Sequence, residues 1–214
     1  MRVTKHEHAA LVIEIDGEKL IVDPGGFTRP IEDLEHVVGV VVTHEHADHW
    51  TPESLARIAQ GTGGAPVYAP AGAAASIREA GLEVTVVAPG DTVELAPFTL
   101  EFFGGRHAVI HESLPVVDNV GVLVNDRFYY PGDSYAVPEG RDVELLAAPV
   151  GAPWLKIGEA MDFVLAVAPH GAFGTHDMTL SSTGLAMHRD RLEWATAQGG
   201  GRFFRLDPGD STEL

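Results

Sequence analysis

The stretch that decides the fold is VVGVVVTHEHADHW, residues 37–50. Its first half, Val37 to Val42, is an almost unbroken run of β-branched residues, which is typical of a strand buried on both faces. The run ends abruptly in HEHADH, residues 44–49. Polar side chains that directly follow a buried strand lie where α/β folds commonly hold their functional sites. The stretch therefore predicts a central strand that delivers a cluster of polar groups to one edge of a sheet.

The residue types in this cluster indicate a metal site. Imidazole nitrogens and carboxylate oxygens suit Zn²⁺, Mn²⁺ or iron. His44, His46 and Asp48 alternate, so a straight strand would not bring all three to one ion, whereas a loop divides them between two ions. Cysteine is absent, which excludes thiolate zinc sites, iron–sulfur clusters and a cysteine nucleophile. A serine hydrolase is disfavoured because no Gly-x-Ser-x-Gly sequence occurs.

Strand and helix patterns are spread over the whole chain. The Asp16-Gly17 turn joins the apolar runs 11–15 and 20–22 into a hairpin, and Thr51-Pro52 opens a helix that ends near Gln60. We expect further strands at 66–69, 84–87, 92–95, 99–103, 120–124, 127–130, 171–175 and, as the last one, 202–206. We expect further helices at 73–80, 154–168 and 182–197, and the apolar face of the helix 154–168 is predicted to be Ile157, Met161, Val164, Leu165 and Ala168. These patterns favour an α/β fold with mixed sheets in a single domain, residues 1–214.

The charge balance narrows the class of partner. The chain carries 14 Lys and Arg against 31 Asp and Glu, a net charge of −17, and no basic run occurs. Proteins that bind a phosphate backbone present clustered cations, so nucleic acid is disfavoured and a small-molecule substrate is expected. No apolar run is long enough to span a bilayer, and no signal peptide is recognised, so we expect a cytoplasmic protein without a membrane partner. Whether it forms a homo-oligomer stays open.

Five segments in order along the chain resemble the metallo-β-lactamase fold superfamily. The central one is Thr43-His44-x-His46-x-Asp48-His49, which matches the signature motif of that superfamily. The others are residues 20–25 (LIVDPG), 105–107 (GRH), 130–134 (YPGDS) and 174–177 (GTHD). The resemblance implies a four-layer αββα sandwich of two mixed β-sheets flanked by helices, with the metal site at one edge. Within the superfamily, the chain is most similar to the short branch related to the ascorbate-6-phosphate lactonase group. This branch lacks a large nucleic-acid-binding insertion.

The resemblance also implies a ligand set for two divalent ions, with zinc as the first choice and manganese or iron as alternatives. His44, His46 and His107 would hold the first ion. Asp48, His49 and His176 would hold the second, and Asp133 would bridge both. For the last ligand His170 competes with His176. We favour His176 because it follows the expected strand 171–175, as the other ligands follow strands.

The function implied is that of a metal-dependent hydrolase, in which a dinuclear metal-bound hydroxide attacks a small ester, lactone or phosphodiester. Asp48 would orient that hydroxide. Two alternatives remain: an iron-dependent redox enzyme or dioxygenase on the same fold, and a non-catalytic metal-binding member.

Several residues near these segments have open roles. His111 is either a catalytic group near the metals, as a proton donor or a contact to the substrate oxyanion, or a histidine that supports a ligand or lies on the surface. His8, expected to precede the first strand, either approaches the site from the Asp23 side or packs elsewhere. Asp23 is expected to accept a hydrogen bond that orients a ligand histidine. Trp50, Tyr135 and Trp154 line a pocket or belong to the core. We expect His6, His36 and His188 to be solvated.

Overall fold

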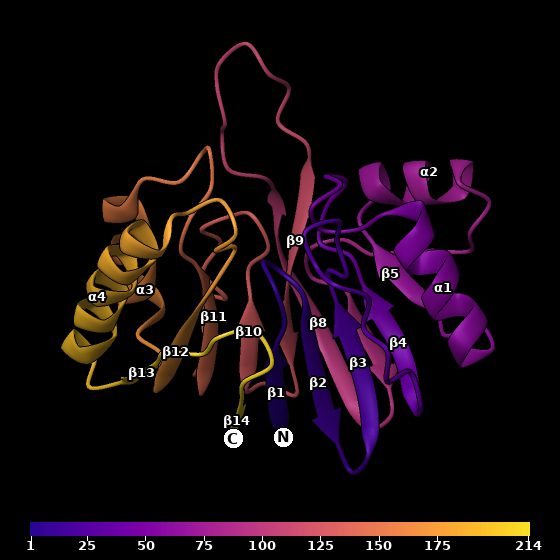
Figure 1. Ribbon diagram of the computed structural model, residues 1–214, viewed down its shortest axis with the longest axis horizontal. Helices are drawn as coiled ribbons and strands as arrows, with labels where there is room; N and C mark the ends of the chain where they lie inside the picture. Colours follow the sequence, from indigo (N-terminus) through magenta and orange to yellow (C-terminus); the bar gives the residue numbers. More distant parts are fainter.

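The chain forms two seven-stranded β-sheets that pack face to face, with two helices against the outer face of each sheet (Figure 1). The computed structural model describes residues 1–214. Each sheet is mixed, with an antiparallel part and a parallel part. This αββα sandwich confirms the predicted fold class.

The first sheet has the strand order β14-β1-β2-β3-β4-β5-β6. Its strands are β1 (Arg2–Lys5), β2 (Leu11–Ile15), β3 (Glu18–Val22), β4 (Val37–Val41), β5 (Val67–Ala69), β6 (Thr85–Val86) and β14 (Ser211–Glu213). The pairs from β14 to β3 are antiparallel and those from β3 to β6 are parallel. The predicted hairpin and the predicted central strand are therefore both confirmed.

The second sheet has the order β13-β12-β11-β10-β9-β8-β7. Its strands are β7 (Thr92–Leu95), β8 (Phe98–Arg106), β9 (Asp118–Val124), β10 (Phe128–Tyr130), β11 (Leu145–Pro149), β12 (Gly171–Thr175) and β13 (Arg202–Phe204). The pairs from β7 to β10 are antiparallel and those from β10 to β13 are parallel. As expected for parallel strands covered on both sides, every residue of β11 and β12 is buried.

The main core lies between the sheets. Fully buried side chains such as Leu11, Ile13 and Leu20 of the first sheet belong to one apolar cluster with Leu100 and Phe128 of the second. Each large apolar side chain removed from water contributes about 1.5–3 kcal/mol, so this layer holds the two sheets together.

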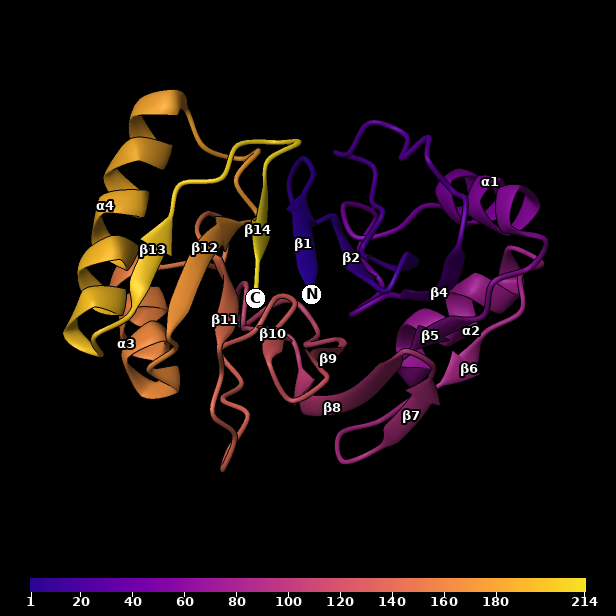
Figure 2. The same cartoon turned by 90° about the horizontal axis from the view of Figure 1, so that it is seen from below.

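The helices cover the two outer faces (Figures 1 and 2). They are α1 (Pro52–Thr62) and α2 (Ala71–Glu79) on the first sheet, and α3 (Ile157–Val167) and α4 (Ser182–Gln198) on the second. Thr51 caps α1, accepting a hydrogen bond from the Ser54 amide in a capping box, and Gly63 ends that helix in a left-handed conformation. None of the four helices is both long and apolar enough to cross a membrane.

The predicted apolar face of α3 is partly wrong. The buried residues are Ala160, Phe163, Val164 and Val167, whereas Leu165 is exposed and Ala168 already ends the helix. Of the predicted face, Val164 is buried, and Ile157 and Met161 are partly buried against the same apolar cluster. The packed face is broader than predicted because α3 contacts α4 as well as β11.

The sequence patterns did not predict three of the strands, which are β1, β11 and β14. Because β1 precedes it, His8 follows the first strand, contrary to the prediction. The expected last strand is also not the last, since β14 follows β13 and pairs with β1 near the two chain ends. Figure 2 looks onto that edge of the molecule, where both termini lie.

The opposite edge collects the carboxyl ends of β3, β4, β8, β10 and β12. At this edge an isolated bridge between His44 and Asn119 joins the two sheets. The Val120 amide donates to the Thr43 carbonyl at 2.9 Å. The loops that leave these strands therefore meet over one small area.

Candidate metal centre

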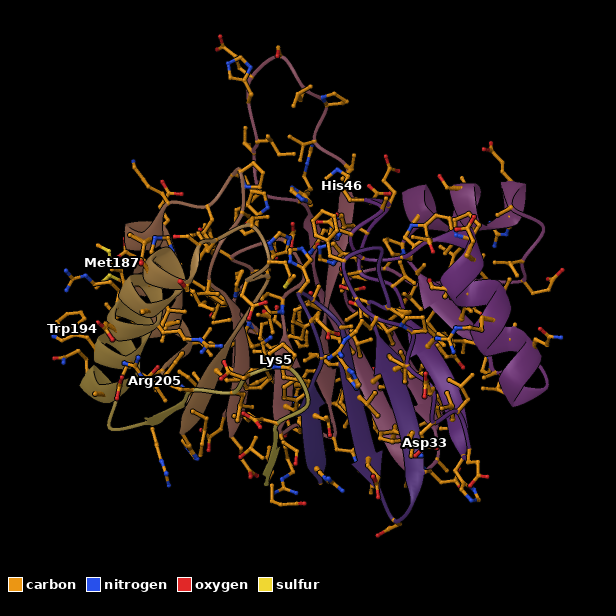
Figure 3. All side chains as sticks on the ribbon, viewed as in Figure 1. Lys5, Asp33, His46, Met187, Trp194 and Arg205 are labelled. Atoms are coloured by element: carbon orange, nitrogen blue, oxygen red, sulfur yellow. The ribbon has the colours of Figure 1, made fainter.

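All the predicted ligands come together at this edge, in two groups. His44, His46, His107 and Asp133 form one group, and His8, Asp48, His49 and His176 form the other. In each group the candidate ligand atoms lie within 4.8 Å of one another. Figure 3 shows His46 at the upper edge of the sandwich, far from the chain ends.

The first group gathers nitrogen atoms around one carboxylate oxygen. His44 Nε2 lies 3.1 Å from His46 Nδ1. His107 Nε2 lies 3.3 Å from Asp133 Oδ2, and His44 Nε2 lies 3.9 Å from the same oxygen. His44 is fully buried, and burial lowers its pKa well below the ordinary value, so its ring is neutral, as a ligand must be.

The second group also contacts Asp133. His49 Nε2 lies 3.2 Å from Asp133 Oδ1, and His176 Nε2 lies 3.1 Å from Asp133 Oδ2. His176 Nε2 is also 3.4 Å from Asp48 Oδ2. The carboxylate of Asp133 thus touches histidines of both groups, which is the arrangement that a bridging ligand requires.

The residues present fit bound cations. His49 Nε2, His107 Nε2, His176 Nε2 and Asp133 Oδ1 are buried and have no hydrogen-bond partner. Buried polar atoms are rarely left in this way unless a ligand or an ion satisfies them. Burial would raise the pKa of Asp133, but His49 and His176 hold it well below its usual range, so the carboxylate is ionised. Nitrogen and carboxylate donors without sulfur suit Zn²⁺, Mn²⁺ or iron.

Asp23 orients one histidine of each group. It is fully buried, and its Oδ2 lies 2.6 Å from His49 Nδ1. The same oxygen accepts the Thr43 hydroxyl at 2.7 Å, and that hydroxyl lies 3.0 Å from His44 Nδ1. Tyr130 also donates its hydroxyl to Oδ2, at 3.0 Å. The predicted orienting role of Asp23 is confirmed by these contacts, which leave Nε2 of both histidines directed at the site.

Backbone carbonyls orient two further histidines. His107 Nδ1 donates to the Ala108 carbonyl and His176 Nδ1 to the Gly151 carbonyl, each at 2.5 Å. Each contact makes Nδ1 the donor and directs Nε2 at the site, so that the neutral ring would present Nε2 without a hydrogen to a metal ion.

His8 belongs to the second group, so of its two predicted alternatives the structure shows the approach to the site. It is fully buried, and its Nε2 lies 3.1 Å from Asp48 Oδ2. Its Nδ1 accepts the Met178 amide at 3.3 Å, so Nε2 carries the hydrogen and donates it to Asp48. His8 therefore orients the carboxylate of Asp48, and its φ of +58° shows that the backbone is held in an uncommon conformation to do so.

The three aromatic residues with open roles separate clearly. The indole of Trp154 donates to Asp133 Oδ2 at 2.9 Å, so it contacts the site. Trp50 donates to the Glu45 carbonyl and lies in the apolar cluster that the first sheet forms with α1 and α2. Tyr135 packs against Trp154 and Phe163.

Two glycines allow the loops to approach this closely. A Cβ on Gly25 would lie 1.8 Å from the Asp48 carbonyl oxygen. Gly132 has φ +63°, and a Cβ there would lie 2.5 Å from Asn119 Oδ1. Any side chain at either position would displace Asp48 or Asp133.

Two predicted candidates do not reach the site. His170 is exposed and pairs with Asp142, Nε2 to Oδ1 at 3.0 Å, so it is His176 that joins the cluster. His111 is exposed on the loop 107–117, hydrogen-bonds to Ser113 and belongs to neither group of candidate ligands. The prediction that His188 is solvated is wrong, because it is half-buried with Nδ1 2.6 Å from the Val150 carbonyl oxygen.

Comparisons with known proteins agree with this geometry. The model of a family described as the beta-lactamase superfamily domain matches residues 2–176. Protein Rv0786c of Mycobacterium tuberculosis is 36% identical over 197 residues, covering 90% of this chain and 91% of that protein.

Two solved structures share the fold. Igni18, described as a novel metallo hydrolase from the archaeon Ignicoccus hospitalis, has a TM-score of 0.77 at 18% identity and covers 100% of this chain and 98% of its own. CmlA, a diiron β-hydroxylase from Streptomyces venezuelae, has a TM-score of 0.75 at 17% identity, covering 100% of this chain and 54% of its own. The narrower resemblance to the ascorbate-6-phosphate lactonase group stays a prediction.

Proposed function

The chain belongs to the beta-lactamase superfamily, and from this premise we propose that it hydrolyses a small ester, lactone or phosphodiester with two divalent metal ions, zinc being the first candidate. The observation that carries the proposal is the position of Asp133 between the two groups. Its carboxylate contacts His107 on one side and His49 and His176 on the other. A single structural ion would not need two such groups.

The residues that would hold the ions follow from the contacts. The first ion would be held by His44, His46 and His107. The second would be held by Asp48, His49 and His176. Asp133 would contact both ions. When bound, such ions lower the pKa of a water molecule toward neutrality and polarise the oxygen of the bond to be cleaved.

Asp48 is suited to handle the proton of the attacking water. Burial would raise its pKa, but the contacts with His176 and His8 lower it well below the ordinary value, so the carboxylate is ionised. Its contacts with both histidines use Oδ2, which leaves Oδ1 to accept a hydrogen from water. Its side chain is 22% exposed, so it can meet a substrate while His49 and Asp133 stay buried.

The test combines metal analysis with a matched pair of variants. Protein purified without added metal is analysed for zinc, manganese and iron, and is then screened with chromogenic phosphodiesters, lactones and esters. We expect His46→Ala to lose metal and activity together, whereas His170→Ala, in an exposed histidine paired with Asp142, keeps both. Full activity in a metal-depleted His46→Ala protein would refute the proposal.

A second candidate is an iron-dependent redox enzyme or dioxygenase. Two observations favour it: the donor set lacks sulfur and suits iron, and the fold is shared with a diiron β-hydroxylase. Native iron together with O₂ consumption would favour the redox enzyme. Native zinc or manganese together with hydrolysis would favour the hydrolase. Tight metal binding without turnover of any substrate would instead favour a non-catalytic metal-binding protein.

A further inference from the structure

We propose that the substrate places an uncharged, largely apolar group, such as a short acyl chain or an aryl ring, in a cavity beside Asp48. This inference rests on the proposed function, since it concerns the same site. It excludes substrates that present a phosphate or carboxylate group to that cavity.

The cavity opens directly at the candidate metal centre. Its volume is about 400 Å³, within the range of roughly 300–1,000 Å³ typical of small-molecule sites. Its lining residues are Gly26, Phe27, Ala47, Asp48, Thr51, Pro153 and Thr179. A group that extends from a bond held at Asp48 would therefore enter this space.

The lining offers nothing to neutralise an anion. It contains no Lys, Arg or His, and its one acidic side chain is Asp48. An anion placed here would find no basic side chain to pair with. Phe27, Ala47 and Pro153 instead present carbon surface, which favours an apolar group.

The nearest arginine-containing cavity does not change this conclusion. It has a volume of about 380 Å³ and shares Gly26 and Thr51 with the first. Its Arg29 already pairs with Glu7 at 2.5 Å, and its Arg57 donates to the Ile31 carbonyl at 2.7 Å. The charge of Arg29 is thus balanced by Glu7, although the Arg29 side chain is 83% exposed, and Arg57 is held at a backbone carbonyl.

A second, independent observation concerns the rim of the site. Five of the nine exposed large apolar side chains lie on loops that leave the metal edge: Phe27, Val109, Ile110, Leu114 and Met178. The loop 107–117 that carries three of them projects beyond the sandwich at this edge (Figure 1). Apolar side chains exposed on the loops at this edge are typical of surfaces that receive an apolar ligand.

Binding of inert amides tests the inference without relying on turnover. The probes are hexanamide, its ω-carboxylate analogue adipamate and its ω-ammonium analogue 6-aminohexanamide, titrated into the metal-loaded full-length chain. Amide chemical shifts of Ala47 and Thr179 report on the cavity. We expect hexanamide to bind at least tenfold more tightly than adipamate and more tightly than 6-aminohexanamide. Equal or tighter binding of either charged probe would overturn the inference.

Two variants sharpen the test, and a third is the control. Phe27→Ala should weaken the binding of hexanamide several-fold. Thr179→Lys, at an exposed position, should shift the binding preference toward adipamate. Trp194→Ala, on the outer surface of α4, should change neither. Unchanged selectivity in Thr179→Lys would show that the probes bind elsewhere and would overturn the inference.

Ester hydrolysis separates this inference from the proposed function. In a series of p-nitrophenyl acyl esters, kcat/KM should rise by up to about fourfold per methylene group until the cavity is filled. If no ester is cleaved but hexanamide binds as described, the proposed function fails and the cavity assignment stands. If esters are cleaved but adipamate binds as well as hexanamide, only the cavity assignment fails.

Discussion

The indole Nε1 of Trp154 lies 2.9 Å from Oδ2 of Asp133, the carboxylate that contacts both groups of histidines. Trp154 is almost fully buried and stacks edge-on against the His107 ring, with the ring centres 5.8 Å apart. The indole can only donate, so it constrains the rotation of a carboxylate whose other contacts are with histidines. One side chain from the segment before α3 thus helps set the position of the shared ligand.

Trp154→Phe should therefore weaken metal binding while leaving the fold intact. The ring is retained, but the hydrogen bond to Asp133 is lost, and loss of such a supporting contact typically costs about 10–100-fold in metal affinity. Competition with a chromogenic chelator measures the change. Trp194→Phe, the same substitution on the exposed face of α4, is the control and should have no effect. Equal affinities in the two variants would contradict a role for the indole.

Asp23→Asn should weaken metal binding at both groups of histidines. Asp23 accepts hydrogen bonds from the Thr43 amide and hydroxyl, from Tyr130 and from His49. An amide group in its place would point a donor at these donors, so we expect metal affinity to fall by about 10–100-fold. Elemental analysis after dialysis measures it. Tyr130→Phe removes one of these bonds and should cost only about 1 kcal/mol of stability, with a smaller loss of metal.

The sequence predicted the parts of the site whose signals are local. The run from Val37 to His49 carries a strand pattern and a ligand pattern side by side, and Thr51-Pro52 marks the start of α1 without reference to the rest of the chain. The resemblance then placed the remaining ligands, each just after a strand. The fold class followed from the same segments.

What the sequence did not reveal depends on distant contacts. His8 reaches Asp48 only because β1 pairs with both β2 and β14, and because its backbone adopts a positive φ. The strand β11 consists of Leu, Ala and Pro, and its strand conformation comes from burial between β10 and β12 rather than from residue preference. The predicted helix 154–168 included Trp154, whereas α3 begins at Ile157 and leaves Trp154 in the preceding loop, where its indole contacts Asp133.

The metal-free protein should lose stability as the pH rises. Burial alone would lower the pKa of His176, but Asp133 and Asp48 outweigh it and raise the pKa to about 9. A raised pKa stabilises the folded state fully below the unfolded value of about 6.5, and this contribution disappears as the pH rises through 9. We expect a loss of the order of 3 kcal/mol between these limits from this residue.

Thermal unfolding in chelator at pH 6 and pH 9.5 measures this loss. Saturating metal should abolish or reverse the trend, because a ligand histidine must release its proton to bind. His176→Asn should flatten the pH dependence of the metal-free protein, whereas His170→Asn, exposed and outside the cluster, should not. A metal-free protein that is equally stable at both pH values would contradict the prediction.

Lys5→Met should destabilise the fold strongly, although Lys5 contacts no candidate metal ligand. Lys5 is fully buried, and its Nζ lies 2.8 Å from Oδ2 of Asp177, which directly follows His176. Removing the ammonium leaves a buried carboxylate with only Arg189, 3.8 Å away, to compensate it. Loss of one partner of a buried pair typically costs about 3–5 kcal/mol.

Lys19→Met provides the matched control for this prediction. Lys19 Nζ lies the same 2.8 Å from Asp33, but the Asp33 side chain is 72% exposed, near the lower edge of the sheet in Figure 3, whereas Lys5 lies inside the molecule. Water solvates Asp33 once its partner is lost. Lys19→Met should therefore lower the free energy of unfolding by only a small fraction of the loss expected for Lys5→Met. Urea unfolding of both metal-free variants measures the difference. Similar midpoints would mean that Asp177 is solvated or neutral in the folded protein, and that the Lys5 pair does not hold the His176 loop against β1.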